Sequence, residues 1–214
     1  MPVEQSVKYG DFQVQTIVTN PPWCENCYIV RHLGTKRQIV VDPGGNEEEI
    51  LAVLKKQGGE TEAIFLTHAH PDHTGAVGPL QQALGIECMV HTREKRVLED
   101  IQKHLDVPIQ SYKLFTDNTP FSLGGIPFRV IATPGHTPGS VIYDFEDFAL
   151  TGDTLFNRGV GRTDLPGGDG RSLVVSISRV LTMLTQKAAL YCGHGPSWVA
   201  DEARLWWSQM REWG

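Results

Sequence analysis

Three histidines and an aspartate lie within six consecutive positions, directly after a strand-like apolar run at residues 63–66. They are His68, His70, Asp72 and His73. A hydrophobic core has no use for such a cluster, because buried imidazole and carboxylate groups are costly unless they are paired or bound to a metal. Neutral imidazole and carboxylate groups suit zinc, and also iron or manganese. The cluster therefore indicates a metal site.

This loop carries potential ligands for more than one ion. In an extended backbone alternate residues share a face, so His68 and His70 are expected to point the same way. Pro71 then turns the chain, so that Asp72 and His73 can face a second point a few ångströms away. The pattern favours two neighbouring metal ions, which need further ligands from elsewhere in the chain.

Candidates for those further ligands are His136, Asp153 and His194. Each follows an apolar strand within a few residues, beside Gly, Pro or Thr. A rigid sheet commonly positions chemistry on the loops at the ends of its strands. Asp153 is the only carboxylate of these three residues, and its two oxygens could bridge a metal pair about 3.5–4 Å apart.

The segments that position these residues show alternating strand and helix patterns, which predict an α/β fold in one domain over residues 1–214. Alternating or continuous apolar runs predict strands at residues 12–19, 27–30, 38–41, 63–66, 86–90, 128–132, 140–143, 148–150 and 188–191. Apolar residues at helical spacing predict helices from Asn46 to Gly58 and at residues 74–84, 94–105, 173–184 and 202–213. Residues 109–121 are polar and predict irregular structure.

Charge and composition exclude several classes of partner. The net charge is −6, which argues against a nucleic-acid partner, because phosphate backbones select basic surfaces. No window approaches the roughly 18 apolar residues of a membrane span, and residues 1–6 lack the basic start of a secretory signal. We therefore expect a cytoplasmic protein without a membrane partner. Cys24 and Cys27 form a Cys-x-x-Cys pair, interpreted as reduced thiols with no assigned function.

The histidine cluster followed by His136, Asp153 and His194 resembles the metallo-β-lactamase fold superfamily in order and spacing over almost the whole chain. Asp42 matches the first aspartate motif of that superfamily. The segments 151–156, 161–164 and 168–169 resemble the glyoxalase II-like hydrolases, and the ending His194-Gly195-Pro196 resembles their compact bacterial form. The resemblance implies a four-layer αββα sandwich with metals at one edge of its two sheets.

The resemblance also implies roles for the site residues. One metal would be held by His68, His70 and His136, and the other by Asp72, His73 and His194. Asp153 would bridge them, and Asp42 would support the site from behind the ligands. The cofactors would be two divalent ions, with Zn²⁺ as the first choice and Fe²⁺ or Mn²⁺ as alternatives. Asp72 would orient a metal-bound hydroxide and pass its proton to the leaving thiolate. Arg162 would bind a carboxylate of the substrate.

The implied activity is hydrolysis of a small-molecule thioester such as an S-hydroxyacylglutathione. The alternative is a mononuclear-iron persulfide dioxygenase acting on glutathione persulfide, which resembles the same family and would bind iron through His68, His136 and Asp153. The chain ends 20 residues after His194, so we expect no C-terminal helical domain of the larger glyoxalase II enzymes. Trp198, Trp206, Trp207 and Trp213 are expected to pack a helix or form a dimer face, which leaves monomer and homodimer both open.

For two of these residues a plainer role stays open. Asp42 could only cap the turn at residues 43–44, and Arg162 could only brace its own loop.

Overall fold

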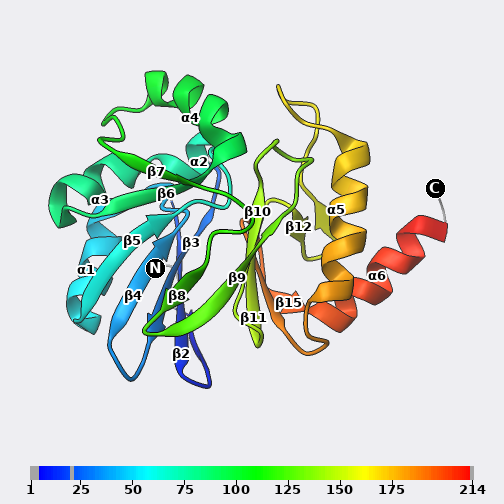
Figure 1. Ribbon diagram of the computed structural model, residues 1–214, viewed down its shortest axis with the longest axis horizontal. Helices are drawn as coiled ribbons and strands as arrows, with labels where there is room; N and C mark the ends of the chain where they lie inside the picture. The colour runs from blue at the N-terminus through cyan, green and yellow to red at the C-terminus, as the bar shows by residue number, and fades with distance from the viewer. Residues whose placement is uncertain (1–4, 20–21, 213–214) are drawn as a thin grey trace.

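The computed structural model describes residues 5–19 and 22–212 of the chain. Two β-sheets pack face to face, and helices cover the outer face of each sheet (Figure 1). This arrangement is the αββα sandwich that the sequence predicts. No helix in the described ranges is both long enough and apolar enough to span a bilayer.

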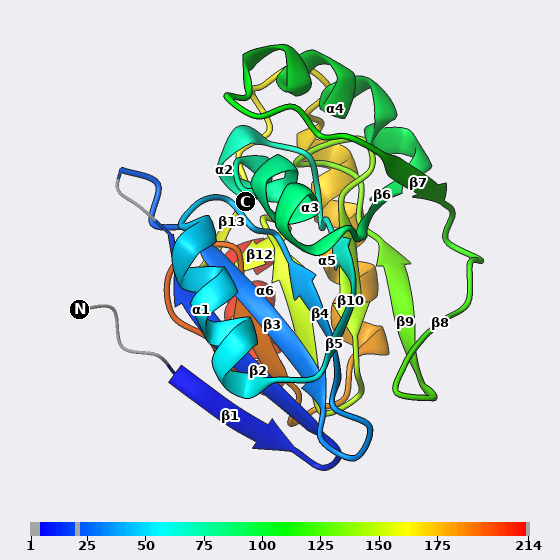
Figure 2. The ribbon, with the colours of Figure 1, turned by 90° about the vertical axis from the view of Figure 1, so that its left-hand side faces the viewer.

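The first sheet contains seven strands in the order in which they occur in the chain. They are β1 Gln5–Tyr9, β2 Phe12–Val18, β3 Asn26–His32, β4 Arg37–Val41, β5 Glu60–Phe65, β6 Glu87–His91 and β7 Tyr112–Phe115. Strands β1 to β4 pair antiparallel, and β4 to β7 pair parallel. Helices α1 Glu47–Gln57 and α3 Val77–Leu84 lie across the outer face (Figure 2), and the remaining helical segments are α2 Pro71–Thr74, η1 Thr92–Glu94, α4 Lys95–Ile101 and η2 Gln102–His104.

The second sheet has six strands in the order β15-β14-β11-β10-β9-β8. Its strands are β8 Phe121–Leu123, β9 Ile126–Ala132, β10 Val141–Asp144, β11 Phe148–Gly152, β14 Ala189–Cys192 and β15 Trp198–Val199. A short ribbon, β12 Leu155–Phe156 with β13 Gly159–Val160, follows β11. Helices α5 Gly170–Met183 and α6 Ala200–Glu212 cover the outer face of this sheet (Figure 1).

Central strands of both sheets are buried on both faces, because alternate residues enter different cores. In β4, Ile39 and Val41 join the core between the sheets, while Val40 joins the core beneath α1 and α3. In β11, Leu150 faces the other sheet and Ala149 faces α5 and α6. This double burial fixes the strands, and therefore fixes where the loops at their ends emerge.

Several local features follow the sequence predictions. The strands predicted at residues 27–30 and 38–41 form the antiparallel hairpin β3–β4, and those predicted at 140–143 and 148–150 form the hairpin β10–β11. Gly85 ends α3 with φ of 66°, the left-handed conformation that a C-terminal glycine commonly adopts. Trp198 packs against Trp206 of α6 with ring centroids 5.9 Å apart, and Trp207 donates a hydrogen bond to Ser178 of α5 at 3.1 Å. These contacts confirm helix packing for three of the tryptophans, whereas Trp213 lies outside the described residues.

Two predictions of secondary structure were wrong. The helix expected at residues 74–84 begins only at Val77, as α3, and the separate short helix α2 ends at Thr74. The later start arises because Gly75 packs against the backbone of Gly44 and Ala76 donates its N–H to the Pro43 carbonyl at 2.9 Å. Residues 109–121 contain β7 and the start of β8, although they were expected to be irregular. Only Phe115 of β7 is buried, so pairing with β6, rather than any apolar pattern, makes this segment a strand.

Candidate metal centre

The structure brings together all seven side chains that were expected to bind metal, from the ends of four strands. His68 and His70 follow β5, and Asp72 and His73 begin α2, the short helix directly after them. The other three residues follow β9, β11 and β14 of the second sheet, and they are His136, Asp153 and His194. Residues up to 126 positions apart in the sequence therefore meet where the two sheets place their loops.

The first group consists of His68, His70 and His136. His136 Nε2 lies 3.2 Å from His68 Nε2 and 3.0 Å from His70 Nδ1. A tetrahedral centre with metal–nitrogen bonds of about 2.0–2.1 Å separates its ligand nitrogens by about 3.3 Å. The three nitrogens therefore already stand near the spacing that a single bound ion requires.

The second group consists of Asp72, His73 and His194, whose ligand atoms lie within 4.8 Å of one another. His194 Nε2 is 3.2 Å and His73 Nε2 is 3.9 Å from Asp72 Oδ2. A carboxylate with two imidazoles is a donor set that suits zinc, iron or manganese.

Asp153 lies between the two groups. Its Oδ2 is 3.6 Å from His136 Nε2 of the first group and 3.6 Å from His194 Nε2 of the second. Its Oδ1 is 3.3 Å from His73 Nε2. Asp153 thus lies within 3.6 Å of ring nitrogens from both groups, as expected for a bridging ligand.

Two buried atoms at the centre of the cluster have no hydrogen-bond partner among the described residues. They are His73 Nε2 and Asp153 Oδ1, which lie 3.3 Å from each other without hydrogen-bond geometry. Buried polar atoms in native proteins are nearly always paired, so each orphan needs an explanation. A metal ion would satisfy both atoms at once, because a neutral ring nitrogen and a carboxylate oxygen are its preferred ligands. The donor set and these orphaned atoms therefore fit the divalent metals of the fold.

The electrostatics of the two groups differ. Burial, followed by the nearby rings, lowers the pKa of His68 well below its usual value and lowers that of His70 to about 4. These rings are therefore neutral at pH 7 and keep their lone pairs for a metal. In the second group burial would raise the pKa of Asp72, but His194 and His73 outweigh it and lower this pKa to about 2.

Hydrogen bonds from outside the cluster orient its histidines. Asp42 faces His73 Nδ1 with Oδ2 at 3.0 Å. The same carboxylate accepts bonds from Thr67, at 2.7 Å from the backbone N–H and 2.5 Å from the hydroxyl. His136 Nδ1 faces the carbonyl of Arg162 at 2.7 Å. Such contacts fix the ring orientation and leave the other nitrogen directed at the metal position.

Asp42 also lies within ligand range of His68 and His73. Its oxygens already face the Thr67 hydroxyl, the Thr67 N–H and His73 Nδ1. The carboxylate is therefore engaged as a support for the loop and for His73. It does more than cap the turn at residues 43–44.

Glu94 is a buried residue of the site that the sequence did not single out. Its carboxylate accepts hydrogen bonds from the Ala69 N–H at 2.9 Å, the Gly139 N–H at 2.7 Å and the Thr137 hydroxyl at 2.5 Å. It thus ties the loop of His68 and His70 to the loop of His136. The only signal in the sequence was an acidic residue just after a predicted strand, which is too common to be diagnostic.

A cleft of about 600 Å³ opens over the cluster. His70, Asp72, His136, Asp153 and His194 line it, together with Pro22, Trp23, Pro71, Phe156, Val160, Arg162 and Leu165. The Arg162 side chain is exposed and forms two hydrogen bonds with the Asp164 carboxylate, at 2.7 and 2.8 Å. The structure therefore places Arg162 at the cleft, as expected for substrate binding, but with its guanidinium paired to a neighbouring residue.

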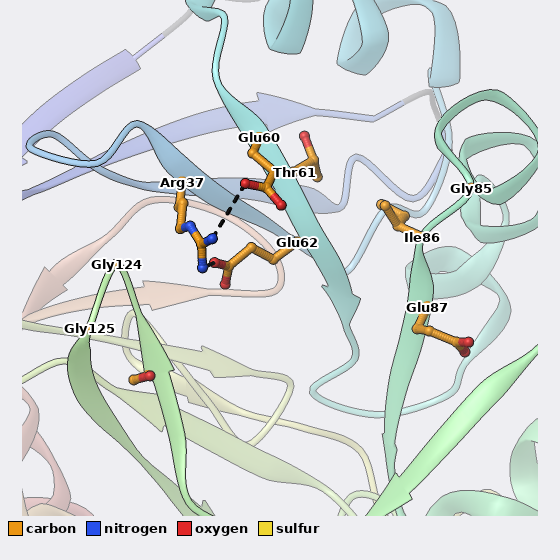
Figure 3. Close-up of a pocket in the computed structure, with 10 residues that line it drawn as sticks. Arg37, Glu60, Thr61, Glu62, Gly85, Ile86, Glu87, Gly124 and Gly125 are labelled. Carbon is orange, nitrogen blue, oxygen red and sulfur yellow. Dashed lines mark hydrogen bonds and ion pairs between the residues drawn. The ribbon is translucent and has the colours of Figure 1, made fainter.

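A second hollow of about 580 Å³ lies at the opposite ends of the strands (Figure 3). Arg37 is paired there with Glu62 at 2.9 Å and with Glu60 at 3.6 Å. None of the seven clustered residues lines this hollow. Size alone does not identify a site, and the convergent ligands place the chemistry at the other end of the sheets.

With fold and ligand geometry established, the class of protein is clear. The chain belongs to the metallo-beta-lactamase superfamily, whose sequence profile matches residues 21–195. The match includes Asp42 and all seven clustered residues.

Three proteins are similar to this chain in sequence or in structure. The hydroxyacylglutathione hydrolase GloC of Haemophilus influenzae is 31% identical over 182 residues, which cover 80% of this chain and 85% of that protein. The structure of BLEG-1, a B3 metallo-beta-lactamase, is 34% identical with a TM-score of 0.78 over 88% of this chain and 95% of the other. TTHA1623 in a di-iron-bound form is 34% identical with a TM-score of 0.77 over 88% and 96%.

Proposed function

We propose that this chain is a metal-dependent thioester hydrolase that acts on an S-hydroxyacylglutathione or a similar small molecule. It would use two divalent ions, with zinc as the first choice, one held by His68, His70 and His136 and the other by Asp72, His73 and His194. The observation that carries this proposal is the contact of Asp153 Oδ2 with both groups, at 3.6 Å to His136 and 3.6 Å to His194. One carboxylate between two complete ligand sets is the arrangement of a paired-metal site.

The bound ions would supply an acidified water and a Lewis acid for the carbonyl oxygen of the substrate. The protein's own groups would orient the reaction. Asp72 lines the cleft and holds its Oδ2 3.2 Å from His194 Nε2. From this position its carboxylate would accept a proton from the attacking water and deliver it to the departing thiolate.

Arg162 would bind a carboxylate of the thiol portion of the substrate. It is the one arginine or lysine among the described residues that line the cleft. Its present partner, Asp164, has an exposed side chain, and exposed ion pairs are worth little, so exchanging that partner for a substrate carboxylate costs little free energy. We place the reaction in the cytoplasm, where the four free cysteines would stay reduced.

The name of the GloC relative supports the thioester substrate. The di-iron form of TTHA1623 supports a two-metal site but favours iron over zinc as the metal. The name of BLEG-1 adds β-lactam hydrolysis as a further competing reaction beside the persulfide dioxygenase.

Metal analysis of protein purified anaerobically without added metal is the decisive experiment, followed by assays of the metal-replete protein. We expect two ions per chain and cleavage of an S-hydroxyacylglutathione, with an Asp72→Ala variant inactive. A single iron with oxygen uptake on glutathione persulfide would establish the dioxygenase instead. Turnover of a β-lactam without thioester cleavage would also overturn the proposal.

A further inference from the structure

Glu25 is a fully buried carboxylate beside the second ligand group, with no part in the site as derived so far. Its backbone carbonyl accepts a hydrogen bond from the Thr19 N–H at 2.7 Å. Its backbone also forms an isolated antiparallel bridge with His194. The position of Glu25 is therefore tied to a residue of the second group.

The side chain of Glu25 points at another residue of that group. Its Oε1 lies 3.7 Å from His73 Nδ1, the same nitrogen that Asp42 Oδ2 approaches to 3.0 Å. The two carboxylates, of Glu25 and Asp42, thus converge on the Nδ1 edge of the His73 ring. The other ring nitrogen, Nε2, faces Asp153. A β-carbon at Gly44 would lie 2.8 Å from Glu25 Oε2 and 1.6 Å from the Asp72 carbonyl oxygen. Glycine at position 44 is what allows this close approach.

The buried carboxylate of Glu25 has few hydrogen-bond partners to compensate for its loss of hydration. Its Oε2 accepts one long hydrogen bond from the Thr19 hydroxyl at 3.3 Å, and its Oε1 has no hydrogen-bond partner among the described residues. An unpaired buried carboxylate is costly, and a nearby positive charge would offset that cost.

An ion in the second group would supply that charge on the other side of the His73 ring. A metal-bound imidazole is a stronger hydrogen-bond donor at its free N–H, and carboxylates behind it raise the basicity of the ring toward the metal. The first group lacks such a pair, because the partners behind its histidines are the Thr67 hydroxyl and the Arg162 carbonyl. This difference in the partners behind the histidines would affect the binding of the second ion alone.

We propose that Glu25 is a positioning residue that, together with Asp42, orients His73 and increases the affinity of the second ion. This inference rests on the proposed assignment of Asp72, His73 and His194 to that ion. Glu25 would thereby favour a two-metal form of the protein over a one-metal form. The number of bound metals is what distinguishes the proposed thioester hydrolase from the mononuclear-iron dioxygenase.

The test is the Glu25→Gln variant, which keeps the size of the side chain and removes its charge. Affinities for Zn²⁺ would be measured by competition with a chromophoric chelator, and the melting temperature by calorimetry after metal removal. We expect the second ion to bind about 10- to 100-fold more weakly, with the first ion unchanged. We also expect the metal-free variant to melt at the same or a higher temperature, because an uncompensated carboxylate has been removed.

Asp144→Asn is the matched control. Asp144 is another buried carboxylate, but it pairs with Arg129 at the end of β10 away from the cluster. This substitution should lower the melting temperature and leave both metal affinities unchanged. If Glu25→Gln does not fold, Glu25→Asp keeps the charge but withdraws the carboxylate from His73, and it should weaken the second ion only.

The outcomes separate this inference from the proposed function. Two ions in the wild-type protein, with unchanged affinities in Glu25→Gln, would refute the role of Glu25 and leave the hydrolase proposal intact. An equal loss of both ions with a lower melting temperature would show a purely structural role. A single ion in the wild-type protein would overturn the two-metal assignment and the role of Glu25 with it.

Discussion

Replacing Gly193 with alanine would push a methyl group into the centre of the metal cluster. Gly193 joins the end of β14 to His194, and its backbone passes directly beside Asp153 and His73. A β-carbon at this position would lie 2.1 Å from Asp153 Oδ1 and 2.8 Å from His73 Cε1. Unstrained contacts between such atoms lie near 3.5 Å, so the Asp153 carboxylate would have to move by more than about 1 Å.

The expected effect is on the site more than on the fold. Because Asp153 contacts both ligand groups, its displacement would disturb both ions, and a misplacement of about 1 Å costs on the order of 100-fold in rate. Overpacking of this kind costs about 1–3 kcal/mol of stability. We expect kcat/KM for the thioester to fall about 100-fold and the metal content to drop below that of the wild-type protein.

Gly195→Ala is the control for this prediction, two residues further along the same loop. Gly195 has φ of +77° and no atom within 4 Å of a built β-carbon. Alanine there should cost about 1 kcal/mol through backbone strain alone, and should leave metal content and kcat/KM nearly unchanged. Wild-type metal content and activity in Gly193→Ala, measured by mass spectrometry and steady-state kinetics, would refute this reading of the site.

Other predictions concern pH, the support of His73 and the substrate. Burial and the neighbouring His136 ring lower the pKa of His70 from 6.5 to about 4. The unfolded chain is therefore protonated at this residue before the folded protein is, and His70 alone should remove about 3 kcal/mol of stability from the metal-free protein as the pH falls from 6.5 to 4. Urea unfolding checks this, and a His70→Gln variant should show a weaker pH dependence. Asp42→Asn removes the charge facing His73 and should weaken metal binding about 10- to 100-fold in a chelator competition. Arg162→Ala should raise KM about 10-fold for a thioester that carries a carboxylate, with kcat unchanged, whereas Asp164→Ala should lower KM by freeing the guanidinium.

Much of this site could be predicted because its metal-binding residue types lie in short, recognisable segments of the sequence. The run from His68 to His73 has no structural explanation, and its spacing alone separates the pair on the extended loop from the pair on α2. His136, Asp153 and His194 could be found since each directly follows an apolar strand. The order of these residues also matches a known superfamily, and that match predicted the αββα architecture.

Glu25 and Glu94 could not be found in the same way. A glutamate in a mixed sequence is most often on the surface, and neither lies in a recognisable motif. Their roles depend on burial and on which loops pack against them, as with the contacts of Glu94 to Ala69 and Gly139. The strand β7 was missed for a related reason, since its pairing with β6 is a long-range contact that local propensity does not encode.

The sequence by itself determined the ligand types, the strands that precede them and the family. Only the tertiary structure decided that His136 stands 3.2 Å from His68, that Asp153 lies between the groups, and that Glu25 faces the back of the His73 ring. The physical reason is that residue type sets which bonds a side chain can form, whereas the packing of two doubly buried sheets sets where the loops meet. The histidine loop thus carries side chains of the kind that bind metals, and the opposing sheet decides which further side chains meet them.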